Sequence, residues 1–254
     1  MNLLCPLDNV RIVLSHTSHP GNIGAAARAM KTMGLGALYL VNPKSFPDNE
    51  ADVRASNARD ILERTHVLGS LEEALHDTVL AVAMTARPRD LSSRTLDARL
   101  AAKELLEHAA QSPVALVFGR ESSGLTTTEI SKCQLTVHIP TNPDYSSLNL
   151  AAAVQIMAYE LRMAFTETIT GQSFAQPPVQ STLQTTRQLA SFHEIELFYR
   201  HLEQAMIDSE FLDPKQPKRL MQRIRRMFAR AHLEKEEVNI LRGILSALEK
   251  HRSR

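Results

Sequence analysis

Short apolar runs rich in β-branched residues alternate with longer amphipathic segments over the first two thirds of the chain. Each run is flanked by turn-forming residues, which is typical of buried strands. The runs lie at residues 10–14, 37–41, 79–84, 114–118 and 134–139. The intervening pattern favours helices at 23–33, 71–76, 97–110, 126–131 and 148–165, and one or two short helices within 45–64. Strands that alternate with helices predict an α/β fold, with a mainly parallel sheet flanked by helices.

The hydrophobic pattern stops near residue 167. Residues 168–184 combine Gly, Pro, Ser, Thr and Gln without apolar periodicity, and this indicates a linker. Apolar residues recur at helical spacing over 185–254, which predicts a small all-α domain. At about 100° per residue, its second helix has two separate arcs. One arc contains Arg219, Arg223, Arg226 and Arg230, and the other contains Leu220, Met221, Ile224, Met227 and Phe228.

Charge is distributed unevenly along the 254 residues. Residues 215–254 contain 12 Lys and Arg against 4 Glu, a net charge of +8, so residues 1–214 carry −7 and the whole chain +1. A basic tail on an acidic body suits a polyanionic partner. Charge alone is explained equally well by a solvated helix face.

Several function classes are disfavoured by composition. Cys5 and Cys133 are far apart, and no targeting segment or membrane-length apolar run occurs, so we expect a cytoplasmic protein with reduced thiols and no membrane association. The ten histidines show no metal-ligand spacing. We therefore expect no metal site.

One stretch, residues 139–157, joins a strand, a polar loop and a helix. Pro140 and Pro143 end the strand, and Ser146 or Ser147 can cap the helix that follows. The helix is apolar nearly all round from Leu148, so we expect burial on more than one side, with a second subunit as one candidate cover. Ligands of α/β sheets bind at the carboxyl ends of strands, so this stretch indicates a ligand site.

Three segments resemble the three motifs of the SPOUT family of RNA methyltransferases, and they occur in the family's order. They are NIGAAARAMKTMG at 22–34, VALVFGRESSGLTTTE at 114–129, and IPTNPDYSSLNLAAAVQIM at 139–157. FGRESSG alone could be any strand-to-helix turn, whereas three motifs in order are specific. The chain is most similar to the TrmJ type, which 2'-O-methylates nucleotide 32 of the tRNA anticodon loop and has a helical extension.

The resemblance implies a fold and an activity. It implies a methyltransferase domain at 1–167 with a trefoil knot, a feature that the hydrophobic pattern alone would not predict. It also implies a homodimer that transfers a methyl group from S-adenosylmethionine to tRNA, with the basic extension at 185–254 binding RNA. Alternatives are the same reaction on ribosomal RNA or at another tRNA position, and a non-catalytic RNA-binding factor of the same fold. A small-molecule α/β enzyme would leave the basic tail unexplained.

The resemblance also assigns cofactor residues to the loops that follow three strands. They are Thr85, Ala86, Gly119, Ile139, Ser146, Ser147 and Leu148. Adenine needs apolar walls and backbone hydrogen-bond partners, which Ile139, Leu148 and a glycine-bearing loop can supply. Gly119 and Gly124 permit close backbone approach.

Arg28 and Asn22 are the implied catalytic residues. A guanidinium keeps its proton near neutral pH, so we favour Arg28 as the group that binds the phosphate beside the target ribose and stabilises the developing 2'-oxyanion. The alternative is that substrate phosphate helps Arg28 to act as a base. Arg28 is also a candidate to act across the subunit interface. Without the other motifs, a surface arginine on an alanine-rich helix would be the simpler interpretation.

Other polar residues near these loops have less specific roles. Arg87, Arg89, Arg94 and Arg120 are candidates to hold the RNA backbone, which positions RNA without reading its sequence. Glu121, Ser147 and Asn149 could equally be caps or loop braces. Tyr145 could stack on a base or support the dimer.

Overall fold

The central element is a parallel seven-stranded sheet. The structure, a computed structural model, describes residues 5–86, 94–170 and 188–252. The strands lie in the spatial order β3(His66–Leu68), β2(Ala37–Val41), β1(Val10–Ser15), β6(Val114–Phe118), β4(Leu80–Met84), β7(Leu135–His138) and β5(Arg94–Asp97). The α/β fold expected from the sequence is confirmed. The knot stays a prediction from the resemblance.

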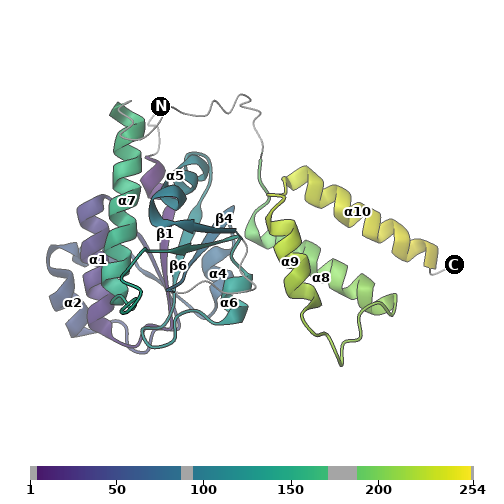
Figure 1. The fold of residues 1–254 in the computed structure, drawn as a ribbon, viewed down its shortest axis with the longest axis horizontal. Helices are drawn as coiled ribbons and strands as arrows, with labels where there is room; N and C mark the ends of the chain where they lie inside the picture. The colour runs from purple at the N-terminus through teal and green to yellow at the C-terminus, as the bar shows by residue number, and fades with distance from the viewer. Residues whose placement is uncertain (1–4, 87–93, 171–187, 253–254) are drawn as a thin grey trace.

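Helices cover both faces of the sheet (Figure 1). One face packs against α1(Pro20–Met33), α2(Asn49–Ala55), α3(Arg59–Glu63), α5(Ala98–Ala109) and α7(Leu150–Thr170), and the 3-10 turns η1(Pro6–Asn9) and η2(Ser56–Ala58) adjoin them. The other face packs against α4(Leu71–Leu75) and α6(Thr127–Ser131). Because both faces are covered, β4 and β6 are buried at every residue and read as continuous apolar runs.

Side-chain size differs between the two faces. On β6, Val114, Leu116 and Phe118 point into the larger core, while Ala115 and Val117 point into the smaller one. β4 follows the same alternation, with its two alanines on the thinner side. The period of two that defines a strand therefore also sorts large and small residues between the layers.

Small residues in α1 allow close helix packing. A Cβ added to Gly24 would lie 2.0 Å from the carbonyl oxygen of Ala51 in α2. The helix has Pro20 in its first turn and ends at Gly34, which adopts a left-handed φ of 81°. The sequence predicts close contact with the sheet from these small residues, and at Gly24 the close neighbour is α2.

The two edge strands, β3 and β5, are absent from the expected elements. Neither contains a fully buried residue, so neither shows the apolar run by which the inner strands are predicted. Within the described residues, no helix is long and apolar enough to cross a membrane.

A separate group of helices follows the sheet (Figure 1). It consists of α8(Phe192–Asp208), α9(Leu220–Ala229) and α10(Lys235–Arg252), which pack around Phe198, Tyr199 and Leu233. This agrees with the expected helical extension. α7 continues to Thr170, into the range expected for the linker, and residues 171–187 lie outside the described residues. The division at 1–167, 168–184 and 185–254 stays a prediction.

The first turn of α8 attaches this helical domain to the sheet domain. Phe192 is 4% exposed and packs in the smaller core of the sheet, and its amide donates to the carbonyl of Thr78 at 2.8 Å. The rings of His193 and His76 stack with centroids 4.4 Å apart. The two parts are therefore joined by shared core packing as well as by the chain.

Candidate active site

The carboxyl ends of three neighbouring strands surround one cavity. β6, β4 and β7 are adjacent and parallel, so the loops after them meet at the same edge of the sheet. The cavity has a volume of about 560 Å³ and is lined by residues 84–86, 118–125, 139, 146–148, 150 and 153. This volume is typical of small-molecule sites. All seven residues predicted to hold the cofactor line it.

The cavity has an apolar floor and a polar rim. Met84, Phe118 and Leu150 are buried beneath it. Its polar lining includes two serine pairs, Ser122 with Ser123 and Ser146 with Ser147, and the charged residues Arg120 and Glu121. An apolar floor suits a flat heterocycle, and serines at the rim can hydrogen-bond to ribose or carboxylate groups.

The loop after β6 is a tight turn that depends on two glycines. Arg120 and Gly124 exchange backbone hydrogen bonds of 3.2 and 2.9 Å. Gly124 has a left-handed φ of 67°, which a glycine adopts without strain. A Cβ on Gly119 would lie 2.2 Å from the carbonyl carbon of Gly124. The glycine spacing in FGRESSG is therefore required by the turn itself.

Arg120 and Glu129 hold this turn from below. An Arg120 guanidinium nitrogen lies 2.9 Å from Oε2 of Glu129, which also accepts the Thr126 amide at 2.7 Å. The Ser15 hydroxyl donates to Oε1 of Glu129 at 2.5 Å. Burial raises the pKa of Glu129, but these hydrogen bonds outweigh it and lower the pKa to about 2. Arg120 therefore has a structural partner, and its predicted contact with RNA stays a prediction.

Asn22 connects all three motifs. Its Nδ2 donates to Oε1 of Glu121 at 3.0 Å, and its Oδ1 accepts from Nδ2 of Asn149 at 2.9 Å. Glu121 also accepts from the Ser18 amide and hydroxyl, at 3.0 and 2.9 Å. Burial raises the pKa of Glu121, but the bonds from Asn22 and Ser18 prevail and lower the pKa to about 2. Asn22 thus fixes the relative positions of α1, the β6 loop and α7.

The cap of α7 differs from the expected one. The helix begins at Leu150, and Oδ1 of Asn149 accepts from the amides of Ala151 and Ala152 at 2.9 and 3.3 Å. The prediction that Ser146 or Ser147 caps this helix is wrong. Both serines are thereby left to line the cavity.

Arg28 does not line this cavity within the same chain. It lies on α1 six residues after Asn22, about 9 Å farther along the helix axis. Its side chain is exposed, and no hydrogen-bond or ion-pair partner contacts it among the described residues. The structure therefore brings Asn22 to the motif network but leaves Arg28 on the surface.

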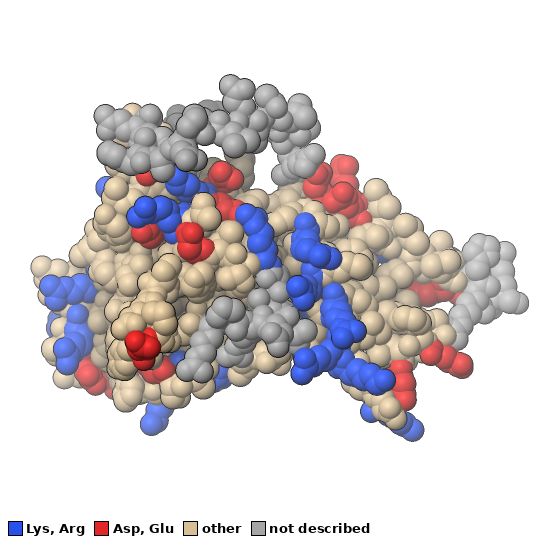
Figure 2. Space-filling view, in the orientation of Figure 1, with Lys and Arg blue, Asp and Glu red and all other residues tan. Residues whose placement is uncertain are grey.

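The exposed face of α9 is basic (Figure 2). Arg219, Arg223, Arg226 and Arg230 are exposed, as the angular pattern predicts. Met227 was expected in the core arc but is 51% exposed. Arg225 projects inward, where it pairs with Glu196 and stacks on the Tyr199 ring.

Of the other arginines predicted to contact RNA, the structure describes some and not others. Arg94 lies on β5 and pairs with Glu104 at 2.9 Å. Arg87 and Arg89 lie outside the described residues. No group of His, Cys, Asp and Glu that could hold a metal ion occurs in the described part of the chain.

Sequence reasoning missed several residues that build the site. Ser122, Ser123 and Ala153 line the cavity, and their position inside the recognised motifs was the available signal. Ser15 was missed because its contact with Glu129 spans 114 positions. The T-x-x-E spacing of Thr126 and Glu129 indicates a capping box, which the structure contains, but it does not reveal the second role of Glu129.

Comparison with known proteins extends over both parts of the chain. Residues 9–159 match the model of the SpoU rRNA Methylase family, and residues 193–254 match that of the tRNA methyltransferase TrmJ, C-terminal domain. A curated relative is the tRNA (cytidine/uridine/adenosine-2'-O-)-methyltransferase TrmJ of Pseudomonas aeruginosa strain UCBPP-PA14. It is 49% identical over 245 residues, which cover 96% of this chain and 95% of the relative.

Solved structures give the same result. The crystal structure of TrmJ from Z. mobilis ZM4 matches with a TM-score of 0.81 and 29% identity, covering 94% of this chain and 98% of that one. The SpoU methyltransferase AviRb from Streptomyces viridochromogenes, solved in complex with the cofactor AdoMet, shares the fold with a TM-score of 0.51 at 20% identity. That match covers 63% of this chain and 61% of AviRb. From its sheet and motif loops to its helical extension, the chain belongs to the SpoU methylase family and, within it, to the TrmJ methyltransferases.

Proposed function

We propose that the protein uses S-adenosylmethionine to methylate the 2'-hydroxyl of nucleotide 32, a cytidine or uridine, in the tRNA anticodon loop. The observation that carries the proposal is the convergence of the loops after β4, β6 and β7 on one cavity, because the cofactor residues implied by the resemblance all line it. Membership in the TrmJ methyltransferases supports tRNA as the substrate.

The residues present fit S-adenosylmethionine. Ile139 and Leu148 would flank the adenine above the apolar floor, and the backbone of the Gly119 turn would approach the cofactor closely. Ser146 and Ser147 would hydrogen-bond to its polar groups. A bound sulfonium supplies a methyl group to the attacking hydroxyl oxygen, with release of a thioether and one proton.

Arg28 would act from a second copy of the chain. It does not line its own cavity, and the outer face of α7 beside that cavity carries Tyr159, which is 47% exposed. A homodimer through this face would cover it and bring Arg28 of one subunit to the cavity of the other. There the guanidinium would bind the phosphate next to the target ribose and stabilise the 2'-oxyanion as the methyl group leaves sulfur.

The exposed arginines of α9 would hold the body of the tRNA. Their phosphate contacts would set the register of the RNA without reading its sequence. Arg87, Arg89 and Arg120 would add contacts near the cavity. Methylation of a ribose 2'-hydroxyl does not require recognition of the base, so the target nucleotide can be selected by its position in the tRNA.

The test is methyl transfer from labelled S-adenosylmethionine to unmodified tRNA, with the product nucleoside and its position read by mass spectrometry. The proposal expects one 2'-O-methyl group, at position 32. Methylation at another tRNA position, or of ribosomal RNA only, would replace the substrate while keeping the chemistry. Tight tRNA binding without transfer, in protein that binds the cofactor, would favour a non-catalytic RNA-binding factor.

A further inference from the structure

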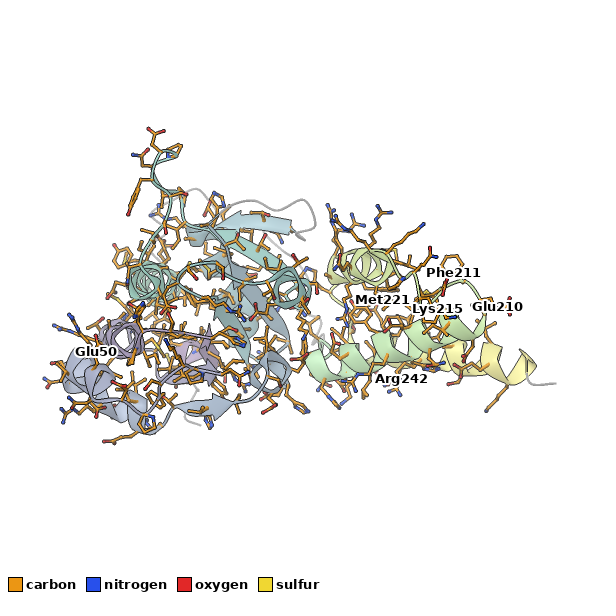
Figure 3. All side chains as sticks on the ribbon, turned by 90° about the horizontal axis from the view of Figure 1, so that it is seen from below. Glu50, Glu210, Phe211, Lys215, Met221 and Arg242 are labelled. Carbon is orange, nitrogen blue, oxygen red and sulfur yellow. The ribbon has the colours of Figure 1, made fainter. Side chains whose placement is uncertain are left out.

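An exposed aromatic residue lies in the loop between α8 and α9, next to the basic face of α9. Phe211 is 70% exposed, whereas its neighbour Leu212 is only 4% exposed. Figure 3 shows Phe211, Glu210 and Lys215 on the part of the helical domain away from the sheet. Burying Phe211 in the small core would be the ordinary outcome for such a side chain, so its exposure calls for an explanation.

The loop that carries Phe211 is well braced. The Leu212 amide donates to the Met206 carbonyl at 3.0 Å, which folds the chain back onto the end of α8. The Asp213 side chain accepts from the Lys215 amide at 2.8 Å, and the Asp213 carbonyl accepts from the Gln216 amide at 3.0 Å. Glu210 and Lys218 adopt left-handed φ angles of 63° and 46°, which non-glycine residues hold only when the surrounding structure fixes them. These contacts brace the backbone on both sides of Phe211 before any partner binds.

Phe211 forms a wall of a cavity of about 570 Å³. Pro217 and Leu220 add apolar surface to it, while Lys218, Arg219 and Arg223 place positive charge at its edge. Residues 210–223 carry four Lys and Arg against one Glu and one Asp. In Figure 2 the Lys and Arg surface of α9 continues toward this loop.

We propose that this cavity binds one unpaired nucleotide of the RNA substrate, whose base stacks on Phe211 while Lys218, Arg219 and Arg223 hold its phosphates. A nucleotide combines a flat π-face with an anionic group, and the cavity offers an aromatic ring and cations side by side. Gln216, which also lines the cavity, can hydrogen-bond to an edge of the base. The cavity lies in the helical domain, so the nucleotide is a second contact, separate from the one that is methylated.

This inference rests on the proposed function, since it assumes an RNA substrate. The chain contains no tryptophan, so Phe211→Trp introduces a single tryptophan fluorophore at the stacking position. Val53→Trp is the matched control, because Val53 is 63% exposed on α2 in the sheet domain. We expect titration with unmodified tRNA, or with an unstructured oligoribonucleotide, to quench Phe211→Trp strongly and Val53→Trp little. Equal quenching of both variants, or quenching of neither, would overturn the inference.

Affinity supplies an independent measurement. Phe211→Leu keeps an apolar side chain but removes the ring, whereas Phe211→Tyr keeps the ring. Stacking of one base on an aromatic ring predicts that Phe211→Leu raises the Kd for tRNA about tenfold or more and that Phe211→Tyr leaves it nearly unchanged. Equal affinity of the Leu and Tyr variants would reject stacking.

The two hypotheses fail in different ways. If the wild-type protein methylates tRNA but the paired fluorescence and affinity results are negative, only the Phe211 site is wrong. If the wild-type protein does not methylate tRNA but the oligoribonucleotide still quenches Phe211→Trp selectively, the nucleotide site holds and the proposed reaction fails.

Discussion

Asn149 donates a hydrogen bond to Asn22 over 2.9 Å, across 127 positions of the sequence. The same Asn22 side chain donates to Glu121, so one amide fixes both the first turn of α1 and the start of α7 relative to the β6 loop. The position of the cavity walls therefore depends on a side chain that does not itself line the cavity.

Asn22→Asp tests this bridge. The new carboxylate can still accept from Asn149 but cannot donate to Glu121, and it places two negative charges together. We expect a loss of about 1–3 kcal/mol in unfolding free energy, measured by urea denaturation at neutral pH. Asn22→Ala removes the bridge without the repulsion and should cost less. If Asn22→Asp and Asn22→Ala lower the unfolding free energy equally, charge repulsion at Glu121 is absent.

A double variant checks the repulsion from the other side. Glu121→Gln removes one of the two charges, and its new amide can donate to the carboxylate at position 22. Adding it to Asn22→Asp should recover part of the lost unfolding free energy.

Glu129 should make stability depend on acid pH. Its folded-state pKa is lowered to about 2 from 4.5, so on acidification the unfolded chain takes up a proton first. This contribution is present above about pH 4.5 and is lost as the pH falls toward 2. Glu129→Gln should lower stability at neutral pH, on the order of 2 kcal/mol, and flatten the pH dependence between those limits. The measurement is urea denaturation from pH 6 to pH 2.5. Parallel curves of unfolding free energy against pH for the wild-type protein and Glu129→Gln would contradict a stabilising role of the Glu129 carboxylate.

Gly119→Ala tests the turn after β6. Its Cβ would meet backbone atoms 2.2 and 2.3 Å away, in Gly124 and Leu125, which cannot move without opening the turn. We expect S-adenosylmethionine binding, measured by calorimetry, to weaken about tenfold or more, because that loop is a wall of the cavity. Gly36→Ala is the control, since a Cβ there has nothing within 4 Å. Equal binding by both variants would show that the cavity tolerates a displaced turn.

Arg28 can be tested by combining two defective subunits. Arg28→Ala should abolish transfer with cofactor binding nearly intact. Thr85→Phe should fill the cavity and abolish cofactor binding. If Arg28 acts across a dimer, co-expressed mixtures should contain heterodimers with one complete site and regain part of the activity, whereas either variant alone stays inactive. A mixture that stays inactive, with heterodimers demonstrated, would place Arg28 in its own subunit's reaction.

The arginines of α9 predict a particular salt dependence. Arg223→Glu with Arg230→Glu should weaken tRNA binding more than tenfold at low salt. Each lost phosphate contact should reduce the slope of log affinity against log salt by about 0.7–0.9. Arg54→Glu with Arg59→Glu makes the same charge change at exposed positions of α2 and α3 and should leave the slope nearly unchanged. If both double variants show the same slope, the α9 arginines make no phosphate contacts and only form a solvated surface.

The sequence predicts best what depends on local pattern. β4 and β6 were predicted because burial on both faces makes every residue apolar. β3 and β5 were missed because edge strands with exposed side chains lack that pattern. The seven residues that the resemblance assigns to the cofactor line one cavity, and their role in binding it stays a prediction. The bridge through Asn22 could not be predicted, because a hydrogen bond between distant positions exists only once the fold has brought them together.

Helical periodicity also has a limit in α9. It separates the exposed arginines from the apolar arc, but it does not show that Arg225 turns inward to Glu196, 29 positions earlier. The partner of a charged side chain depends on the neighbouring helix, and angular position alone does not identify it.

The burial of Phe192 in the core of the sheet domain bears on how the protein can be dissected. Truncation before α8 would remove this ring and the hydrogen bond from the Phe192 amide to the Thr78 carbonyl, and would leave a hollow over α4 lined by apolar side chains such as Leu75. A shortened protein that failed to methylate RNA would thus report damaged packing as well as lost RNA contacts. The two parts are better separated by surface substitutions than by cutting the chain.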